Sequence, residues 1–197
     1  MDVRKSDKLS LPIDINEMKF EEIIETAYDI FKNDIMDKKT RVKYKGKFIF
    51  IKFDHWIEYK AEMFWHLISL GPKEQFQVFP CENNISDNIC NMNCINKVRK
   101  VTLANGQVRN ICLYRASRIK WITEIINLAN KDDESVEVWE KDNKKHIRFK
   151  HQDVDYAIIL EMNKGTYQLV SAFPVFYINK KLTFNTDYKN YKKNKNQ

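Results

Sequence analysis

Short runs of β-forming residues alternate with polar turns over the last third of the chain. The runs are SVEVWE, KHIRFK, VDYAIILEM and TYQLVSAFPV, and they are separated by KDN, HQD and NKG. β-branched and aromatic residues favour strands, and closely spaced strands of this kind connect as an antiparallel meander. The pattern therefore predicts a four-stranded antiparallel meander over residues 135–178. Its third run, Val154–Met162, is apolar on both faces and is expected to be a central strand covered on both sides.

Upstream of this meander, apolar residues recur at spacings of three and four, which is typical of amphipathic helices. The spacing predicts helices over Asn16–Met36, Ile57–Leu70 and Arg115–Ala129. Between the first two, RVKYKGKFIFIKF alternates in the manner of a hairpin that turns at Lys45-Gly46. We expect an α+β fold in which N-terminal helices pack on the C-terminal four-stranded antiparallel β-meander.

The domain organisation follows from where these patterns begin and end. Residues 1–15 are expected to be a flexible lead-in, 16–178 a single α+β domain, and 179–197 a basic tail. Residues 71–112 show no clear period and contain an Asn-rich run. Connections of this length are uncommon in compact domains unless they fold locally or bind a ligand, so we interpret 71–112 as an insertion or lid.

The positive charge is concentrated at the C-terminal end. The 197 residues carry a formal charge of +7, and residues 180–197 hold six lysines against one aspartate, which is +5. Such a tail attracts polyanions without sequence preference, or it is a disordered segment that improves solubility.

The composition gives no indication of a metal, a cofactor or a membrane segment. The four cysteines lack the paired spacing of zinc ligands, and no run approaches the roughly 18 apolar residues of a membrane span. We expect no metal, no cofactor, no membrane association and a cytoplasmic location with reduced thiols.

One histidine lies off the apolar seam of its predicted helix. Ile57, Ala61, Phe64 and Ile68 fall on one side at 100° per residue, whereas His66 projects about 180° from Ile57. Packing in a core therefore does not explain His66. It is a candidate catalytic histidine or an ordinary surface residue.

Two arginines lie at the start of the third predicted helix. Arg115 and Arg118 fall on much the same side as its apolar stripe. They either pair with acidic groups at the edge of the core or line a cleft. A cation at a helix start opposes the helix dipole, and a bound anion would relieve that repulsion.

Polar groups also share faces of the meander. His146, Arg148 and Lys150 lie on one side of a strand and form a basic strip suited to nucleic-acid binding. In the last run, Tyr167 and Ser171 fall on one face by alternation, and they are interpreted as a small core residue beside a tyrosine or as a hydroxyl pair near a cleft.

Several reaction types are not supported by motifs. The chain has no phosphate-binding loop, no dinucleotide-binding glycine pattern, no HExxH and no GxSxG. The remaining histidine, arginine, tyrosine and serine side chains suffice for RNA cleavage without a metal. A base takes the 2′-hydroxyl proton, cations stabilise the phosphorane, and an acid protonates the leaving 5′-oxygen.

Several runs resemble a known group of nucleases. The runs FWHLISL, RASRIKWITEII, KKHIRFK, DYAIIL and YQLVSAFPV follow one another within residues 45–178. They resemble phage-associated nuclease-like proteins of the superfamily that includes barnase, EndoU, colicins and RelE. The resemblance implies helices followed by a four-stranded antiparallel sheet and a metal-independent endoribonuclease of toxin or phage-conflict type, with RNA as substrate and an antitoxin or immunity protein as a partner. It also implies catalytic roles for His66, Arg115, Arg118, Tyr167 and Ser171.

Two other classes of function fit the same residues. The chain could be a non-catalytic nucleic-acid-binding or regulatory domain of a mobile element, in which aromatic and basic side chains contact the polymer. It could also be an immunity or scaffold protein whose basic side meets an acidic protein. RNA cleavage that depends on His66 would distinguish the endoribonuclease from these two classes.

Overall fold

The computed structural model describes residues 5–15, 17–71 and 99–195, and it has a mixed α+β architecture, as expected. The helices are α1 (Phe20–Phe31), which continues as the π-helical turn η1 (Lys32–Met36), α2 (Glu62–Leu67), α4 (Leu113–Ala116), α5 (Trp121–Asn130) and α6 (Ile178–Lys195). The first strands are β1 (Lys43–Tyr44), β2 (Lys47–Phe50), β3 (Trp56–Ile57), β4 (Lys60–Ala61), β5 (Ser69–Leu70), β6 (Lys100–Thr102) and β7 (Val108–Ile111). The last strands are β8 (Val136–Lys141), β9 (Lys144–His151), β10 (Val154–Asn163) and β11 (Thr166–Pro174). Among these described residues, no helix is long and apolar enough to span a bilayer.

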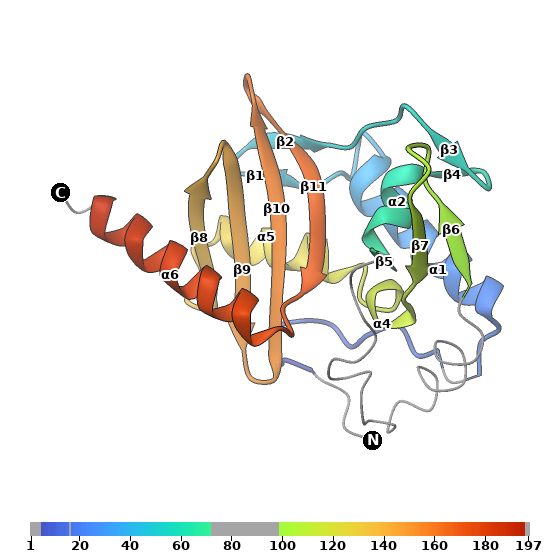
Figure 1. Cartoon of the computed structure of the whole chain (residues 1–197), viewed down its shortest axis with the longest axis horizontal. Helices are drawn as coiled ribbons and strands as arrows, with labels where there is room; N and C mark the ends of the chain where they lie inside the picture. Colours follow the sequence, from blue (N-terminus) through green and yellow to red (C-terminus); the bar gives the residue numbers. More distant parts are fainter. Residues whose placement is uncertain (1–4, 16, 72–98, 196–197) are drawn as a thin grey trace.

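The main sheet has six strands in the order β1-β2-β11-β10-β9-β8, not the four expected (Figure 1). Strands β8 to β11 pair antiparallel with their neighbours in the chain. Strand β2 joins β11 in parallel and brings β1 with it. The extra strands come from the hairpin at Lys45-Gly46, whose turn residues both have positive φ (46° and 78°), as a tight two-residue turn requires.

Helices cover both faces of this sheet. In Figure 1, α5 lies behind β8–β11 and α6 crosses in front of them. On the α5 side, alternate residues of β10 are buried with Ile122, Ile125 and Ile126 of the helix. On the α6 side, Ala157 packs with Trp139 and Phe184. Strand β10 is therefore buried on both faces, as its continuous apolar run predicts.

The helix starting at residue 57 is shorter than predicted. Residues 56–61 form the small hairpin β3–β4, and α2 begins only at Glu62. Glu58 and Tyr59 have φ of 48° and 61°, and two left-handed residues in succession cannot belong to a right-handed helix. The residues after α2 pair with β7 as strand β5.

The other two predicted helices also differ from expectation. α1 begins at Phe20, because the Lys19 N–H donates to the Glu22 carboxylate at an N···O distance of 2.8 Å and caps the helix there. The predicted helix over Arg115–Ala129 is two helices, α4 and α5, separated by a tight turn at 117–120. In that turn Ser117 and Arg118 both donate to the Tyr114 carbonyl, which diverts it from a regular helical bond.

The described part of the predicted insertion is strand-rich. Strands β5, β7 and β6 form a three-stranded antiparallel sheet that lies beside α2 and away from the main sheet (Figure 1). Residues 72–98, which make up most of the predicted insertion or lid, lie outside the described residues.

The basic tail is a docked helix rather than a loose segment. α6 lies across the sheet, and Phe184 is buried between the rings of Trp139, His146 and Phe173. The sequence shows no amphipathic stripe here because a single buried phenylalanine, helped by partly buried Tyr188 and Tyr191, makes the contact among lysines and asparagines.

Phe184→Ala is therefore expected to lower the free energy of unfolding by about 3–5 kcal/mol, because it empties a buried aromatic site. Leu182→Ala, on the exposed side of the same helix, is the matched control and should change it by about 0.5 kcal/mol or less. Equilibrium denaturant unfolding measures both. Equal, small effects would mean that α6 does not support the sheet.

Candidate functional site

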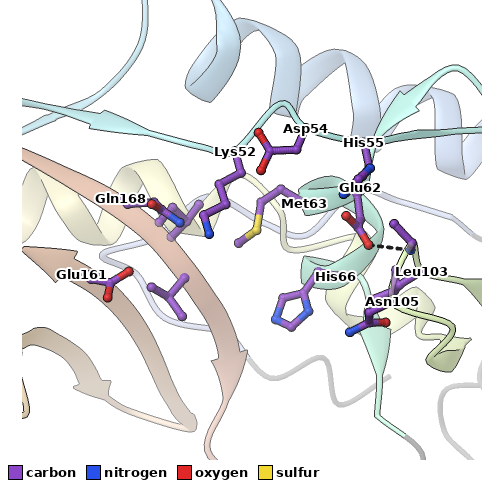
Figure 2. A pocket seen from close by; sticks show the side chains of 13 residues that line it. Lys52, Asp54, His55, Glu62, Met63, His66, Leu103, Asn105, Glu161 and Gln168 are labelled. Atoms are coloured by element: carbon purple, nitrogen blue, oxygen red, sulfur yellow. Dashed lines mark hydrogen bonds between the residues drawn. The ribbon is translucent and has the colours of Figure 1, made fainter. Parts of the chain in front are cut away.

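A cleft of about 590 Å³ opens between the main sheet and α2 (Figure 2). It has the size of a small-ligand site. Its polar and charged lining residues are Lys52, Asp54, His55, Glu62, His66, Asn105, Glu161 and Gln168. His66, the candidate histidine of the sequence, is one of them. In Figure 2 its ring points into the cleft from α2, and the Lys52 side chain points in from the opposite wall.

The α2 wall is held by bonds at the start of the helix. The Glu62 N–H donates to the His55 carbonyl at 3.1 Å, so the loop carrying His55 is tied to the helix carrying His66. The Glu62 carboxylate accepts the Ala104 N–H at 2.8 Å, which attaches the turn between β6 and β7 (Figure 2). Glu62 and His66 are four residues apart and therefore share one helix face.

The other end of α2 is held by a buried polar network around Ser69. The Ser69 hydroxyl donates to the Trp65 carbonyl at 2.5 Å and accepts from Arg109 Nε at 2.8 Å. The Ser69 carbonyl accepts from Arg109 Nη2 at 2.9 Å and from Arg115 Nη1 at 2.6 Å. Charge-assisted bonds in a buried setting are strong and directional, so this network fixes α2 against β7 and α4.

The cleft combines groups of opposite chemical character. It holds one lysine, two imidazoles and the three carboxylates Asp54, Glu62 and Glu161. Imidazoles exchange protons near neutral pH, and a carboxylate that accepts an imidazole N–H fixes its tautomer. The arrangement is therefore suited to proton transfer next to a positive charge.

The two predicted arginines do not line this cleft. Arg115 is buried and donates to Ser69, and Arg118 is buried with its guanidinium carbon 3.5 Å from the centroid of the Tyr114 ring. Arg118 also donates to the Tyr114 carbonyl and the Ser117 hydroxyl. The sequence allowed a pair with acidic groups or a cleft lining, whereas the structure shows both arginines buried and bonded to carbonyl and hydroxyl oxygens.

Tyr167 and Ser171 lie on opposite faces of the sheet, contrary to the alternation expected. Tyr167 pairs with Met162 of β10, and Ser171 pairs with Ile159 of β10. Met162 and Ile159 are three residues apart and therefore point to opposite sides of the sheet, and each partner in β11 points to the same side as the residue that it faces. A bulge at Val170 inserts the extra residue that reverses the pattern. Tyr167 packs edge-on against Tyr44, whose pKa burial raises to about 12. Neither hydroxyl residue lines the cleft.

The predicted basic strip is covered by α6. Arg148 is 1% exposed, binds Asp155 through two bonds of 2.8 and 2.7 Å, and donates to Asn185 of α6. His146 stacks on Trp139 with ring centroids 5.0 Å apart. Lys150 alone of the three is exposed, so the strip mainly holds α6 to the sheet.

Sequence reasoning missed most of the cleft. Lys52 continues the alternation of Phe48 and Phe50, and Glu62 is four residues before His66, so both carried a usable signal. His55 and Asn105 lie in irregular segments with no period, and only the tertiary structure brings them to His66.

Comparison with known proteins adds no further constraint. No protein-family model, curated protein or solved structure matches the chain. Within residues 5–15, 17–71 and 99–195, no group of three or more histidine, cysteine, aspartate or glutamate side chains could hold a metal ion.

The environment of His146 predicts a dependence of stability on pH. Burial lowers the pKa of His146 from 6.5, although the nearby Asp187 acts the other way. The unfolded chain then binds the proton more readily than the folded protein, so the free energy of unfolding should fall as the pH drops below about 6.5.

His146→Phe, which keeps an apolar ring against Trp139, should make this decline shallower. Denaturant unfolding between about pH 7.5 and 5.5 measures the difference. A decline as steep in the variant as in the wild type would show that His146 does not contribute to it.

Proposed function

We propose that this protein is a metal-independent endoribonuclease, of toxin or phage-conflict type, whose reaction takes place in the cleft between the main sheet and α2. The observation that carries the proposal is the presence of two histidines and a lysine in one cleft, with Lys52 and His55 contributed by the connection between β2 and β3 and His66 by α2. RNA supplies its own nucleophile, so an enzyme needs only to position the chain, move protons and neutralise charge.

The proposed reaction uses these groups in sequence. One imidazole of the pair His55 and His66 takes the proton of the 2′-hydroxyl, and the 2′-oxygen attacks the adjacent phosphorus. Lys52 neutralises the charge that grows on the phosphorane oxygens. The other imidazole, protonated, gives its proton to the departing 5′-oxygen, which leaves a 2′,3′-cyclic phosphate. This set replaces the predicted one, of which only His66 lines the cleft.

A relation to the barnase, EndoU, colicin and RelE superfamily is part of the proposal. What supports it is the order of elements, with helices before the consecutive antiparallel strands β8–β11 and α5 packed against them. The hairpin β1–β2 and the helix α6 would then be additions to that core. An antitoxin or immunity protein is the protein partner that such an enzyme would have.

The alternative is a non-catalytic RNA-binding or regulatory domain. Such a domain would bind RNA through aromatic and basic side chains and would not need imidazoles in a cleft. The two functions differ in one measurable property: the enzyme cleaves RNA, and the binding domain leaves it intact.

The purified protein is expected to cleave single-stranded RNA in the presence of EDTA and to leave 2′,3′-cyclic phosphate ends. His66→Ala should lower the cleavage rate by about 10²- to 10⁴-fold with little change in RNA binding, as the loss of a general acid or base does. His151→Ala, a histidine outside the cleft bonded to Asp7, is the matched control. If the wild type leaves RNA intact with and without ribosomes, the binding function replaces the enzymatic one.

Lys52→Met should lower kcat by about 10²-fold, the size of effect seen when one donor to a developing oxyanion is removed. Lys150→Met removes an exposed lysine elsewhere on the sheet and should leave kcat unchanged. Single-turnover cleavage of a short RNA measures both. A loss confined to KM would assign Lys52 to binding rather than to the chemical step.

A further inference from the structure

Strand β2 presents two large aromatic side chains to solvent. Phe48 and Phe50 are 39% and 38% exposed, whereas Ile49, between them, is buried. Phe50 lies opposite Gln168 in the pairing of β2 with β11, and Gln168 lines the cleft. The exposed face of β2 is therefore continuous with the cleft wall.

Cations gather over these rings. The guanidinium carbon of Arg41 lies 4.8 Å from the centroid of Phe50 and 5.7 Å from that of Phe48, and Lys43 Nζ lies 4.5 Å from that of Phe48. Arg41 is 9% exposed, and its Nε has no hydrogen-bond partner among the residues described. That Nε is itself shielded from solvent, so what Arg41 and Lys43 contribute at this face is their positive charge.

Two more exposed aromatic residues follow β2 in the chain, one in the connection to β3 and one in β3. Phe53 and Trp56 are both exposed, and their rings stack with centroids 6.4 Å apart. Lys52, between Phe50 and Phe53 in the chain, points into the cleft (Figure 2). Along the chain from β2 onward, two aromatic side chains are therefore followed by a lysine at the cleft and then by two further aromatic side chains.

We propose that Phe48, Phe50, Phe53 and Trp56 form a stacking platform that binds single-stranded RNA and leads it into the cleft. Bases stack on the rings, and Arg41 and Lys43 neutralise the phosphates. The inference rests on the proposed function, for which it names the substrate class. Unpaired bases have free faces for stacking, whereas the bases of a duplex are already stacked on each other, so the platform selects unpaired RNA.

The chemistry favours RNA over a protein strand at this place. The sheet edge next to the platform is β1, which is only two residues long and includes Lys43, and short lysine-bearing edges discourage strand addition. The carboxylates Asp54, Glu62 and Glu161 line the cleft itself. A polyanion therefore meets cations first along the path.

The fluorescence of Trp56 can report whether a base stacks on the platform. Of the four tryptophans, Trp65, Trp121 and Trp139 are at most 1% exposed, and Trp56 is 54% exposed. A base that stacks on the protein can therefore quench only Trp56. Titration of the wild type with a single-stranded oligodeoxynucleotide of about ten nucleotides, within the usual site size, should quench the fluorescence, and Trp56→Phe should abolish the quenching. The probe has no 2′-hydroxyl, so it cannot be cleaved and reports binding alone.

The second measurement is affinity for the same probe. Phe48→Leu and Phe50→Leu keep apolar bulk but remove the ring, and each should weaken binding by about fivefold to a hundredfold. Tyr177→Leu, an equally exposed aromatic outside the platform, is the matched control and should bind as the wild type does. Thermal unfolding of each variant verifies that the fold is retained.

Binding and cleavage outcomes separate the two proposals. Quenching at Trp56 together with weakened binding in the leucine variants supports the platform, and it does so even if the wild type cleaves no RNA. Full affinity in the leucine variants, fluorescence that stays unquenched at saturation, or equal affinity for a duplex of the same sequence overturns the platform. Cleavage that persists in that case leaves the proposed enzyme intact with a different path for its substrate.

Discussion

The position of the cleft depends on one buried residue, Ser69. Its carbonyl accepts bonds from two buried arginines, Arg109 and Arg115, and its hydroxyl connects Arg109 to the Trp65 carbonyl at the end of α2. α2 is only six residues long and could not hold its place by itself. The network supplies the missing rigidity, and the direction in which His66 points follows from it.

The cleft exists because two structural units meet at β11. One wall comes from the main sheet, through Glu161, Gln168 and the Lys52 segment, and the other comes from α2 and the turn between β6 and β7. Neither wall contains a complete set of reactive groups. His66 lies on the α2 side, and Lys52 and His55 lie three residues apart in the connection from β2 to β3, so their arrangement depends on how closely the two walls are held.

Predictions from the periodicity of apolar residues hold where the helices and strands are regular. Ala61, Phe64 and Ile68 are buried as the predicted seam requires, and His66 lines the cleft, even though α2 spans only Glu62–Leu67. The short β-forming runs likewise match the strands β8–β11, although the alternation of faces in β11 holds only up to Leu169. The continuous apolar run also identifies β10 as buried on both faces.

The predictions from sequence fail where a single residue interrupts the alternation of a strand, or where a single buried contact holds a helix that has no apolar stripe. The bulge at Val170 reverses the faces of β11, and no propensity marks that valine as the extra residue. α6 has no apolar stripe because Phe184 makes the main buried contact, so its sequence resembles a solvated tail.

The parallel pairing of β2 with β11, shown in Figure 1, joins Ile49 to Tyr167, from opposite halves of the chain. Contacts this distant in sequence form late, and during synthesis β2, which leads to Lys52, has only β1 as a partner until β11 has left the ribosome. The cleft that Lys52 and His66 share therefore has both of its walls only after β11 has been synthesised.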